Sequence, residues 1–285
     1  MATTLYLIAT PIGNLEDITV RALRILREEV ALIACEDTRQ SRKLLDHYEI
    51  RKPLISYHEH NEAIRAEEIL VALDGGDSVA LISDAGTPLI SDPGYRVVAA
   101  AIANGIAVVP IPGASAVLAA LTASGLPTNE FRFAGFFPSK SAARRHALEK
   151  IAGDSVTTVA YESPHRILHT LSDMAEILGN RPIVLTRELT KLHEEFLRGS
   201  AQTIREQLAA RESVKGEITL VIGPAEGVVN ITDPLEELAR LQRDGLDRMT
   251  AIKTVAKRLG LPKREVYRLA AGAGPDNSPP GKHRG

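Results

Sequence analysis

Short apolar runs alternate with amphipathic segments along the first half of the chain. Each run is apolar at consecutive positions, which is typical of strands in a parallel sheet covered on both faces. The segments between the runs carry apolar residues at the three-to-four spacing of helices. The predicted strands are 5–9, 30–34, 54–57, 79–82 and 107–111, and the predicted helices are 18–29, 39–48, 61–73, 95–104 and 115–124. This pattern predicts an α/β domain built on a parallel sheet.

The alternation resumes near Pro127, where residues 131–137 hold most of the phenylalanines. The predicted strands of this half are 157–161, 182–186, 195–198 and 217–222, and the predicted helices are 144–151, 167–178 and 204–210. We therefore expect one α/β domain at 1–116 and a second at 117–228. Residues 229–272 are predicted to form a helical extension, and 273–285 a disordered tail, because glycine, proline and polar residues dominate that end.

Polar or glycine- and proline-rich loops follow all five predicted strands of the first half. They span 10–14, 35–39, 57–61, 83–94 and 112–116, and the longest has the sequence SDAGTPLISDPG. The carboxyl ends of parallel strands lie at one edge of a sheet, and open α/β sheets bind their ligands at that edge. The five loops therefore predict a ligand site and an enzyme.

Known sequence motifs limit which ligand the predicted site could bind. The first loop lacks the Gly-x-Gly-x-x-Gly pattern of dinucleotide sites, and the sequence contains no P-loop. Residues 113–117 begin like the nucleophile elbow of a hydrolase, in which Ser115 would be the nucleophile. Val117 occupies the position of the second glycine of that motif, so we expect Ser115 to be a helix N-cap instead. His58 and His60 lack further ligand residues nearby, so no metal site is expected.

Composition places the chain among ordinary globular proteins, with 44% hydrophobic and 25% charged residues. A membrane-spanning helix needs about 18 consecutive apolar residues, and we find neither such a run nor a secretion signal, so we expect a cytoplasmic protein. Cys35 is the single cysteine. It therefore has no disulfide partner within the chain, and it is expected to be buried at the end of an apolar run.

Positive charge is concentrated near the carboxyl end, although the formal net charge is only −2. Residues 249–269 predict a helix, a turn at 260–262 and a second helix, which is the spacing of a helix-turn-helix. Lys263, Arg264 and Arg268 on the second helix are expected to contact nucleic acid. The alternative is a basic helical hairpin that docks on the core or on a partner subunit.

Six motifs occur together in a fixed order: ATPIGNLEDIT at 9–19, EDTR at 36–39, the loop at 83–94, PGASA at 112–116, YESPH at 161–165 and TRELTK at 186–191. In this combination the chain resembles the bacterial family of ribose-2′-O-methyltransferases of small-subunit (16S) ribosomal RNA. That family belongs to the tetrapyrrole-methylase-like, class III group of S-adenosylmethionine methyltransferases. Six motifs in order are far more specific than any one of them.

The resemblance implies a fold, a donor and an acceptor. The fold is two α/β domains of the tetrapyrrole methylase type with S-adenosylmethionine in the cleft between them, usually in a homodimer. The acceptor is the 2′-hydroxyl of a cytidine in the decoding region of 16S rRNA in the small ribosomal subunit. Matching the family's motifs position by position implies donor-binding roles for Pro11, Ile12, Gly86, Thr87, Pro88, Ile90, Ser115, Ala116, Tyr161 and Glu217.

A ribose hydroxyl is a weak acid, so a base or a charge stabiliser near its oxygen would speed its methylation. The strand-end candidates are Glu36, Glu59, Glu188 and Lys191, with Asp37 and His60 also in range. The alternative for each acid beside an arginine is a structural ion pair. Asp84 and Asp92 are expected to shape their loop rather than to act in catalysis.

Basic residues at strand ends and helix starts are candidates for phosphate contacts with RNA. They are Arg39, Arg144, Arg145, Arg166 and Arg187. For Arg144 and Arg145 the alternative is a solvated helix face.

Two other functions stay open from the sequence. A tetrapyrrole or precorrin C-methyltransferase would share the fold and the donor, but it would not need the basic carboxyl-terminal helices. A non-enzymatic regulator that binds nucleic acid would use those helices, but it would not need so many polar loops at one sheet edge.

Overall fold

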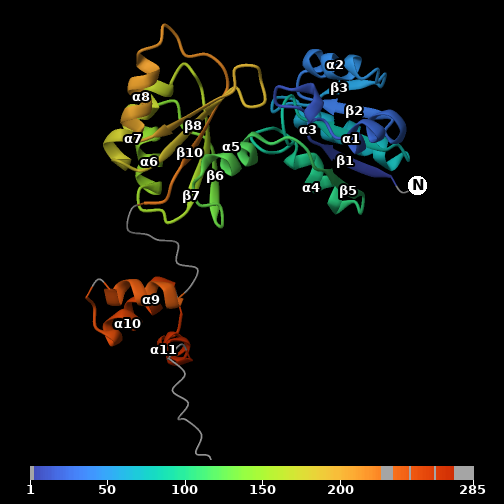
Figure 1. Ribbon diagram of the computed structural model, residues 1–285. Helices are drawn as coiled ribbons and strands as arrows, with labels where there is room; N and C mark the ends of the chain where they lie inside the picture. Colours follow the sequence, from blue (N-terminus) through green and yellow to red (C-terminus); the bar gives the residue numbers. More distant parts are fainter. Residues whose placement is uncertain (1–2, 226–233, 244, 260, 273–285) are drawn as a thin grey trace, which may run out of the picture. The chain divides into compact units, whose positions relative to one another are not determined.

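The computed structural model describes residues 3–225, 234–243, 245–259 and 261–272 (Figure 1). The chain divides into two compact units, Met1–Glu226 and Gly227–Gly285. The predicted tail at 273–285 lies outside the described residues, as do residues 226–233, where the predicted second domain ends and the predicted extension begins.

The first sheet of unit 1 has five strands, all parallel, in the order β3-β2-β4-β1-β5. They are β1 (Thr4–Ile8), β2 (Leu32–Cys35), β3 (Leu54–Ser56), β4 (Val79–Ile82) and β5 (Ala107–Ile111). All four residues of the central β4 are buried. This confirms the predicted parallel sheet, and its five loops indeed leave at one edge. Cys35 is fully buried, as expected.

Helices cover both faces of this sheet. One face packs on α1 (Val20–Arg24) and α2 (Thr38–His47), and the other on α3 (Glu62–Asp74) and α4 (Tyr95–Ala103). The single helix predicted over 18–29 is wrong in detail: a 3₁₀ turn, η1 (Leu15–Asp17), and a π-helical turn, η2 (Ile25–Glu29), flank α1. The N–H of Val30 bonds the carbonyl of Ile25 five residues back, which widens the last turn.

The second sheet of unit 1 is mixed, with the order β6-β7-β10-β8-β9. Only β6 and β7 are parallel, and the other pairs are antiparallel. The strands are β6 (Phe131–Phe136), β7 (Thr157–Glu162), β8 (Ile183–Arg187), β9 (Glu195–Gly199) and β10 (Ile218–Ile222). Four were predicted as strands, and the fifth, β6, is the phenylalanine-rich segment.

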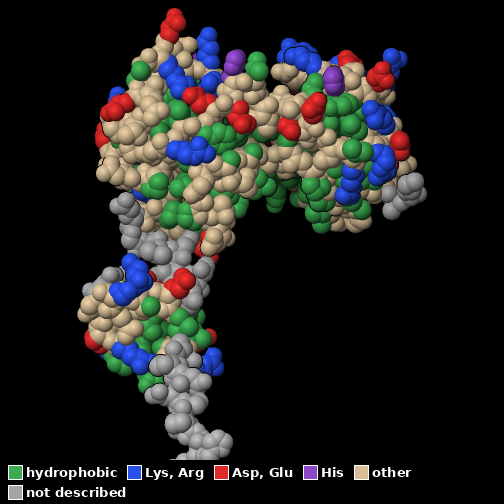
Figure 2. All heavy atoms as spheres, viewed as in Figure 1, with side chains coloured by type: hydrophobic (Ala, Val, Ile, Leu, Met, Phe, Trp, Pro, Cys, Tyr) green, Lys and Arg blue, Asp and Glu red, His purple; other side chains and the backbone are tan. Residues whose placement is uncertain are grey.

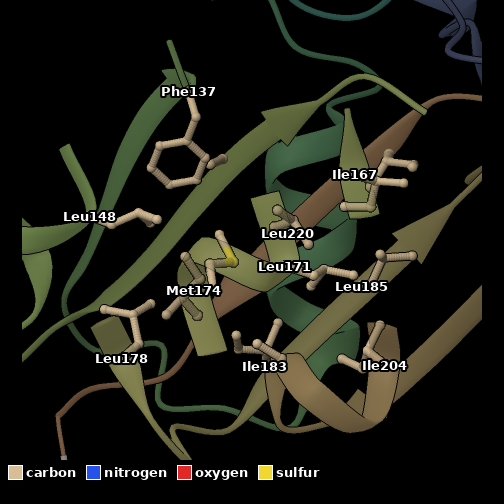
Figure 3. Close-up of a cluster of buried hydrophobic side chains, with 14 of the residues drawn as sticks. Phe137, Leu148, Ile167, Leu171, Met174, Leu178, Ile183, Leu185, Ile204 and Leu220 are labelled. Carbon is tan, nitrogen blue, oxygen red and sulfur yellow. The ribbon is translucent and has the colours of Figure 1, made fainter. Parts of the chain in front are cut away.

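The two faces of this sheet pack on different helices (Figure 1). On one face α6 (Ser141–Ile151), α7 (Ile167–Leu178) and α8 (Ala201–Ala209) enclose the largest apolar cluster, in which Leu148, Met174 and Leu220 are fully buried (Figure 3). The other face packs on α5 (Ala116–Ser124), and Ile12 from the loop after β1 joins that cluster. A single apolar cluster therefore includes residues from both halves of unit 1.

Unit 2 consists of α9 (Pro234–Arg243), α10 (Arg248–Leu259) and α11 (Lys263–Gly272) in its described part. The three helices share a core that includes Leu238, Ile252, Val255 and Val266. The two helices predicted around 260–262 are present as α10 and α11. No helix in the described ranges is both long and apolar enough to cross a membrane.

Candidate active site

A cavity of about 550 Å³ lies among loops from both sheets of unit 1. The first sheet contributes the loops that follow β1, β4 and β5, and the second contributes β6, the end of β7 and the start of β10. The lining residues are Ile12, Asp84, Ala85, Gly86, Thr87, Ile90, Ser91, Asp92, Ser115, Ala116, Phe136, Tyr161, Glu162, Ser163, Pro164, Gly216, Glu217, Ile218 and Thr219. We call this the donor cavity.

The loop at 83–94 is joined by backbone hydrogen bonds to the loop that follows β1. The N–H of Thr10 donates to the carbonyl of Gly86 at 2.9 Å, and the N–H of Gly86 donates back at 3.0 Å. Gly86 has φ +88°, and a Cβ there would lie 3.3 Å from Cγ2 of Ile12. A side chain at this position would be strained and would crowd the cavity wall, which explains the glycine.

Two residues of the same loop have a strained backbone. Leu89 and Ser91 have φ of 71° and 68°, values that residues other than glycine rarely adopt. Such strain persists only where surrounding contacts enforce it, and it is frequent at binding sites. The Thr87 hydroxyl donates to the carbonyl of Ala114 at 3.2 Å, which ties this loop to the loop after β5.

Ser115 closes the amino end of α5. Its hydroxyl accepts the N–H of Leu118 at 3.4 Å, so the predicted N-cap is confirmed. The capped amino end of this helix borders the donor cavity, since Ser115 and Ala116 both line it.

The wall from the second sheet is aromatic and apolar around Tyr161. Its ring meets Phe133 edge-on at 5.0 Å between centroids and Phe136 at 5.4 Å. Burial, with smaller contributions from the charges of Asp92 and Glu217, raises the pKa of Tyr161 to about 12. Tyr161 is therefore a neutral hydrogen-bonding group across the physiological range.

Glu217 is held by residues of the loop that follows β8. Lys191 Nζ donates to Glu217 Oε2 at 3.0 Å and to Glu188 Oε1 at 2.8 Å, and the same Glu188 oxygen accepts the backbone N–H of Glu217 at 2.9 Å. The ion pair lowers the pKa of Glu188. A Cβ on Gly13 would overlap the Lys191 stem, so this loop also packs closely against the first half of unit 1.

Carboxylates gather on the first-sheet side. Asp92 accepts a short hydrogen bond from the Ser83 hydroxyl, and Asp84 Oδ1 accepts the backbone N–H of Asp37 at 3.0 Å. Burial first, and neighbouring acidic charges second, raise the pKa of Glu36, and burial likewise raises those of Asp84 and Asp92. Acidic side chains are exposed where the two halves of unit 1 meet (Figure 2). This side of the cavity suits a cationic ligand.

Eight of the ten residues predicted to bind the donor line this cavity: Ile12, Gly86, Thr87, Ile90, Ser115, Ala116, Tyr161 and Glu217. Pro11 and Pro88 do not, and Pro88 instead borders a small void behind the loop with Glu36 and Asp92. Phe136, Gly216 and Ile218 also line the cavity, and none of the three was predicted from the sequence. Only the phenylalanine cluster gave any signal for these three.

The predicted catalytic residues lie in three different places. Glu36 lines a second, more open cavity of about 530 Å³. Glu188 and Lys191 form the ion pair behind Glu217, outside the lining of the donor cavity. Glu59 is exposed and lines neither cavity. Asp92 bonds Ser83 of its own loop, as expected, whereas Asp84 bonds Asp37 of the loop after β2, and both aspartates line the donor cavity.

Several predicted RNA-binding arginines are engaged in ion pairs. Arg144 is buried and pairs with Asp173 at 2.7 Å, an arrangement that favours a structural role. The other pairs of this kind are Arg145 with Asp173 and Glu176, Arg166 with Glu162, and Arg187 with Glu195. The Arg39 side chain pairs with Asp37 but stays 88% exposed. Lys263, Arg264 and Arg268 are exposed on α11.

Among the described residues, no three histidine, cysteine or acidic side chains come together in a way that would hold a metal ion. His58 and His60 instead line the second cavity, with ring centroids 6.0 Å apart.

Comparison with known proteins gives both family and fold. The family model of tetrapyrrole (corrin/porphyrin) methylases matches residues 4–205. A protein of Halalkalibacterium halodurans named "Ribosomal RNA small subunit methyltransferase I" is 48% identical over 93% of this chain and 94% of its own length. A protein of Mesorhizobium japonicum with the same name is 48% identical over 93% of this chain and 90% of its own.

A solved structure shares the fold of unit 1. It is a uroporphyrin-III C-methyltransferase from Thermus thermophilus in complex with S-adenosylhomocysteine. It superposes with a TM-score of 0.52 at 20% identity and covers 80% of this chain and 99% of its own.

Proposed function

The chain belongs to the tetrapyrrole (corrin/porphyrin) methylase family, and we propose that it transfers the methyl group of S-adenosylmethionine to the 2′-hydroxyl of a cytidine in 16S rRNA of the small ribosomal subunit. The observation that carries this proposal is the 48% identity, over 93% of the chain, to relatives named for ribosomal RNA methylation. Family membership also confirms the resemblance and the two-sheet fold that the six motifs predicted.

The residues of the donor cavity fit S-adenosylmethionine. Ile12, Ile90 and Phe136 offer apolar surface for a flat base, and Glu217 offers a fixed carboxylate for hydroxyl groups. Asp84 and Asp92 place negative charge where a ligand that carries both an ammonium and a sulfonium group gains from it. When bound, this ligand supplies a methyl group already attached to a good leaving group.

The protein's own part is therefore to position the acceptor and to exclude water. The hydrogen-bonded loops after β1, β4 and β5 form a wall whose shape is set by backbone geometry, and Gly86 pairs two of these loops. Tyr161 and its phenylalanine neighbours close the opposite side with apolar surface. A wall fixed before binding costs little reorganisation during the reaction.

We also propose that the protein contacts the RNA directly and acts as a homodimer in the cytoplasm. RNA binding is supported by the exposed basic residues of α11 and by Arg39 at the sheet edge. A homodimer is supported by exposed apolar side chains on the neighbouring helices α3 and α4, where Ile64, Val71, Tyr95 and Ile102 lie seven residues apart in pairs. Sedimentation of the purified chain tests the dimer.

The experiment that tests the function supplies methyl-labelled S-adenosylmethionine to purified small ribosomal subunits. We expect label in 16S rRNA at one cytidine, in a dinucleotide that resists alkali and nuclease because its 2′-oxygen is methylated. Large subunits and uroporphyrinogen III serve as alternative acceptors. Labelling of the tetrapyrrole, or a failure of the protein to bind S-adenosylhomocysteine by calorimetry, would contradict the proposal. Binding of duplex DNA without any RNA methylation would favour the regulator.

A further inference from the structure

The second cavity of unit 1 opens at the carboxyl ends of three neighbouring strands, β2, β3 and β4. Its volume, about 530 Å³, is close to that of the donor cavity. It is lined by Glu36, Asp37, Thr38, Arg39, Ser56, His58, His60 and Asp84. The donor cavity uses the ends of β1, β4 and β5, so the loop after β4 separates the two.

Asp84 lines both cavities, and it is the only residue that does so among those lining the two. Its Oδ1 atom is fixed by the N–H of Asp37 at 3.0 Å, and Asp37 is held in turn by Arg39, whose Nη2 lies 2.9 Å from Oδ2. Oδ2 of Asp84 makes no hydrogen bond to any other described residue. A positioned carboxylate oxygen therefore stands where a group in the second cavity meets a group in the donor cavity.

The other side chains of the second cavity match the parts of a nucleotide. The imidazole of His58 is held by Asn61 Nδ2, 3.1 Å from its Nε2, and with His60 it offers flat rings for a base. Proteins read single-stranded RNA by stacking bases on such rings and by bonding their edges. A carboxylate such as that of Glu36 can accept a hydrogen bond from the exocyclic amino group of cytosine. Uracil has a carbonyl at that position, which a carboxylate repels.

We propose that this second cavity binds the acceptor nucleotide, a single-stranded cytidine. Glu36 accepts a hydrogen bond from the amino group of its base, and Asp84 accepts one from its 2′-hydroxyl. The inference rests on the proposed function and names the acceptor site for it. Asp84 then lies at the contact between acceptor and donor, a role beyond the shaping of its loop that the sequence predicted. Glu36 then has a role in base choice instead of proton transfer.

The first test uses small subunits reconstituted with cytidine or uridine at the methylated position. Filter retention in the presence of S-adenosylhomocysteine measures their affinity for the protein. Wild-type protein is expected to prefer cytidine by about tenfold, since one well-placed contact to a base edge discriminates by roughly that much. Glu36→Gln is expected to lose most of this preference, because an amide bonds both bases. Glu67→Gln, an exposed change on α3, is the matched control and keeps it.

The second test addresses Asp84. Subunits with 2′-deoxycytidine at the same position lack the hydroxyl, so wild-type protein is expected to bind them about tenfold more weakly than the ribose form. Asp84→Ala is expected to bind both forms equally. A retained preference for the ribose in Asp84→Ala, or a retained preference for cytidine in Glu36→Gln, overturns the inference.

Calorimetry with S-adenosylhomocysteine separates the inference from the function on which it rests. Glu36→Gln is expected to bind this ligand within about twofold of wild type, because Glu36 does not line the donor cavity. If wild-type protein methylates the cytidine while Glu36→Gln loses donor affinity and keeps its base preference, the acceptor site lies elsewhere. If wild-type protein methylates no subunit at all, the proposed function itself fails.

Discussion

Lys191 donates through Nζ to Oε2 of Glu217 at 3.0 Å, across the gap between the loop that follows β8 and the residue that precedes β10. Glu217 lines the donor cavity and Lys191 does not. Lys191 therefore acts on the cavity through Glu217. We therefore expect it to act as a positioning residue, whereas the sequence alone pointed to catalysis.

We expect Lys191→Met to weaken binding of S-adenosylhomocysteine about tenfold, the effect of losing a hydrogen bond to a charged group. The turnover number at saturating donor should change far less. Calorimetry and steady-state kinetics give the two quantities. Lys150→Met, an exposed change on α6, is the control and should alter neither. A turnover loss above about a hundredfold with unchanged donor affinity would show instead that Lys191 acts directly on the reacting atoms.

Gly86 provides a test of the cavity wall that separates strain from crowding. Gly86 and Gly76 both have positive φ, +88° and +98°, but a Cβ at Gly86 would lie 3.3 Å from Ile12, and one at Gly76 would meet nothing within 4 Å. Replacing either by alanine should cost about 1–2 kcal/mol of stability from the left-handed backbone.

Only Gly86→Ala should also weaken donor binding, by about tenfold or more, because only its methyl group enters the cavity wall. Thermal unfolding and calorimetry on the two variants measure both effects. Equal donor affinity in the two variants would show that the wall adjusts and that Gly86 is needed for backbone conformation alone.

The fold was largely predictable because its strands carry their signal locally. Val79–Ile82 is apolar at every position, and such a run has no solvated face. Ser115 was predictable as a cap for the same reason, since the bond to Leu118 spans three residues. β6 was harder to assign as a strand because none of its residues is buried, and two of its phenylalanines, Phe131 and Phe136, are exposed.

The remainder of the site depends on contacts that are distant in sequence. Arg144 looked like a surface base, but Asp173 on α7 pairs with it in the interior. Asp84 looked like a loop cap, and its place between two cavities follows only from the strand order, which brings β2 beside β4. Motif spacing identifies the residues of a loop but not the loop across from it.

The pH dependence of donor binding follows from Asp84 and Asp92. Burial raises the pKa of both carboxyls, and hydrogen bonds from the Asp37 N–H to Asp84 and from the Ser83 hydroxyl to Asp92 offset part of this rise. A carboxyl with a raised pKa in the folded state stabilises the fold at low pH, and this contribution is lost as the pH rises through the folded pKa. Ionised carboxylates, in turn, favour a sulfonium ligand.

We therefore expect the affinity ratio of S-adenosylmethionine to S-adenosylhomocysteine to increase between about pH 4, near the ordinary pKa of a carboxyl, and about pH 7.5, because only the former carries the sulfonium charge. Calorimetric titrations at the two pH values measure it. Asp92→Asn keeps an acceptor for Ser83 and removes one titrating charge, so the change should shrink. A ratio that is the same at both pH values would mean that neither carboxylate faces the sulfonium.

The last helix of unit 2 presents basic side chains to solvent. Val266 and Ala270 lie on the side of α11 that packs into the three-helix core. Lys263, Arg264 and Arg268 are exposed on this helix. Exchanging these three for glutamine should leave folding nearly unchanged, since exposed substitutions cost within about 0.5 kcal/mol each. Binding of a 16S rRNA fragment should weaken, and the slope of log affinity against log salt should become shallower by about 2, the value for three lost phosphate contacts on single-stranded RNA.

The matched control removes the same charge from unit 1 through Arg21→Gln, Lys43→Gln and Lys150→Gln, three exposed positions on α1, α2 and α6. Fluorescence anisotropy over a salt series gives both slopes, and sedimentation follows the oligomeric state. If the α11 variant keeps its salt slope and dissociates into smaller species, these bases contact a partner subunit. If the slope falls equally in both variants, RNA is drawn by overall charge, and α11 has no special part in binding it.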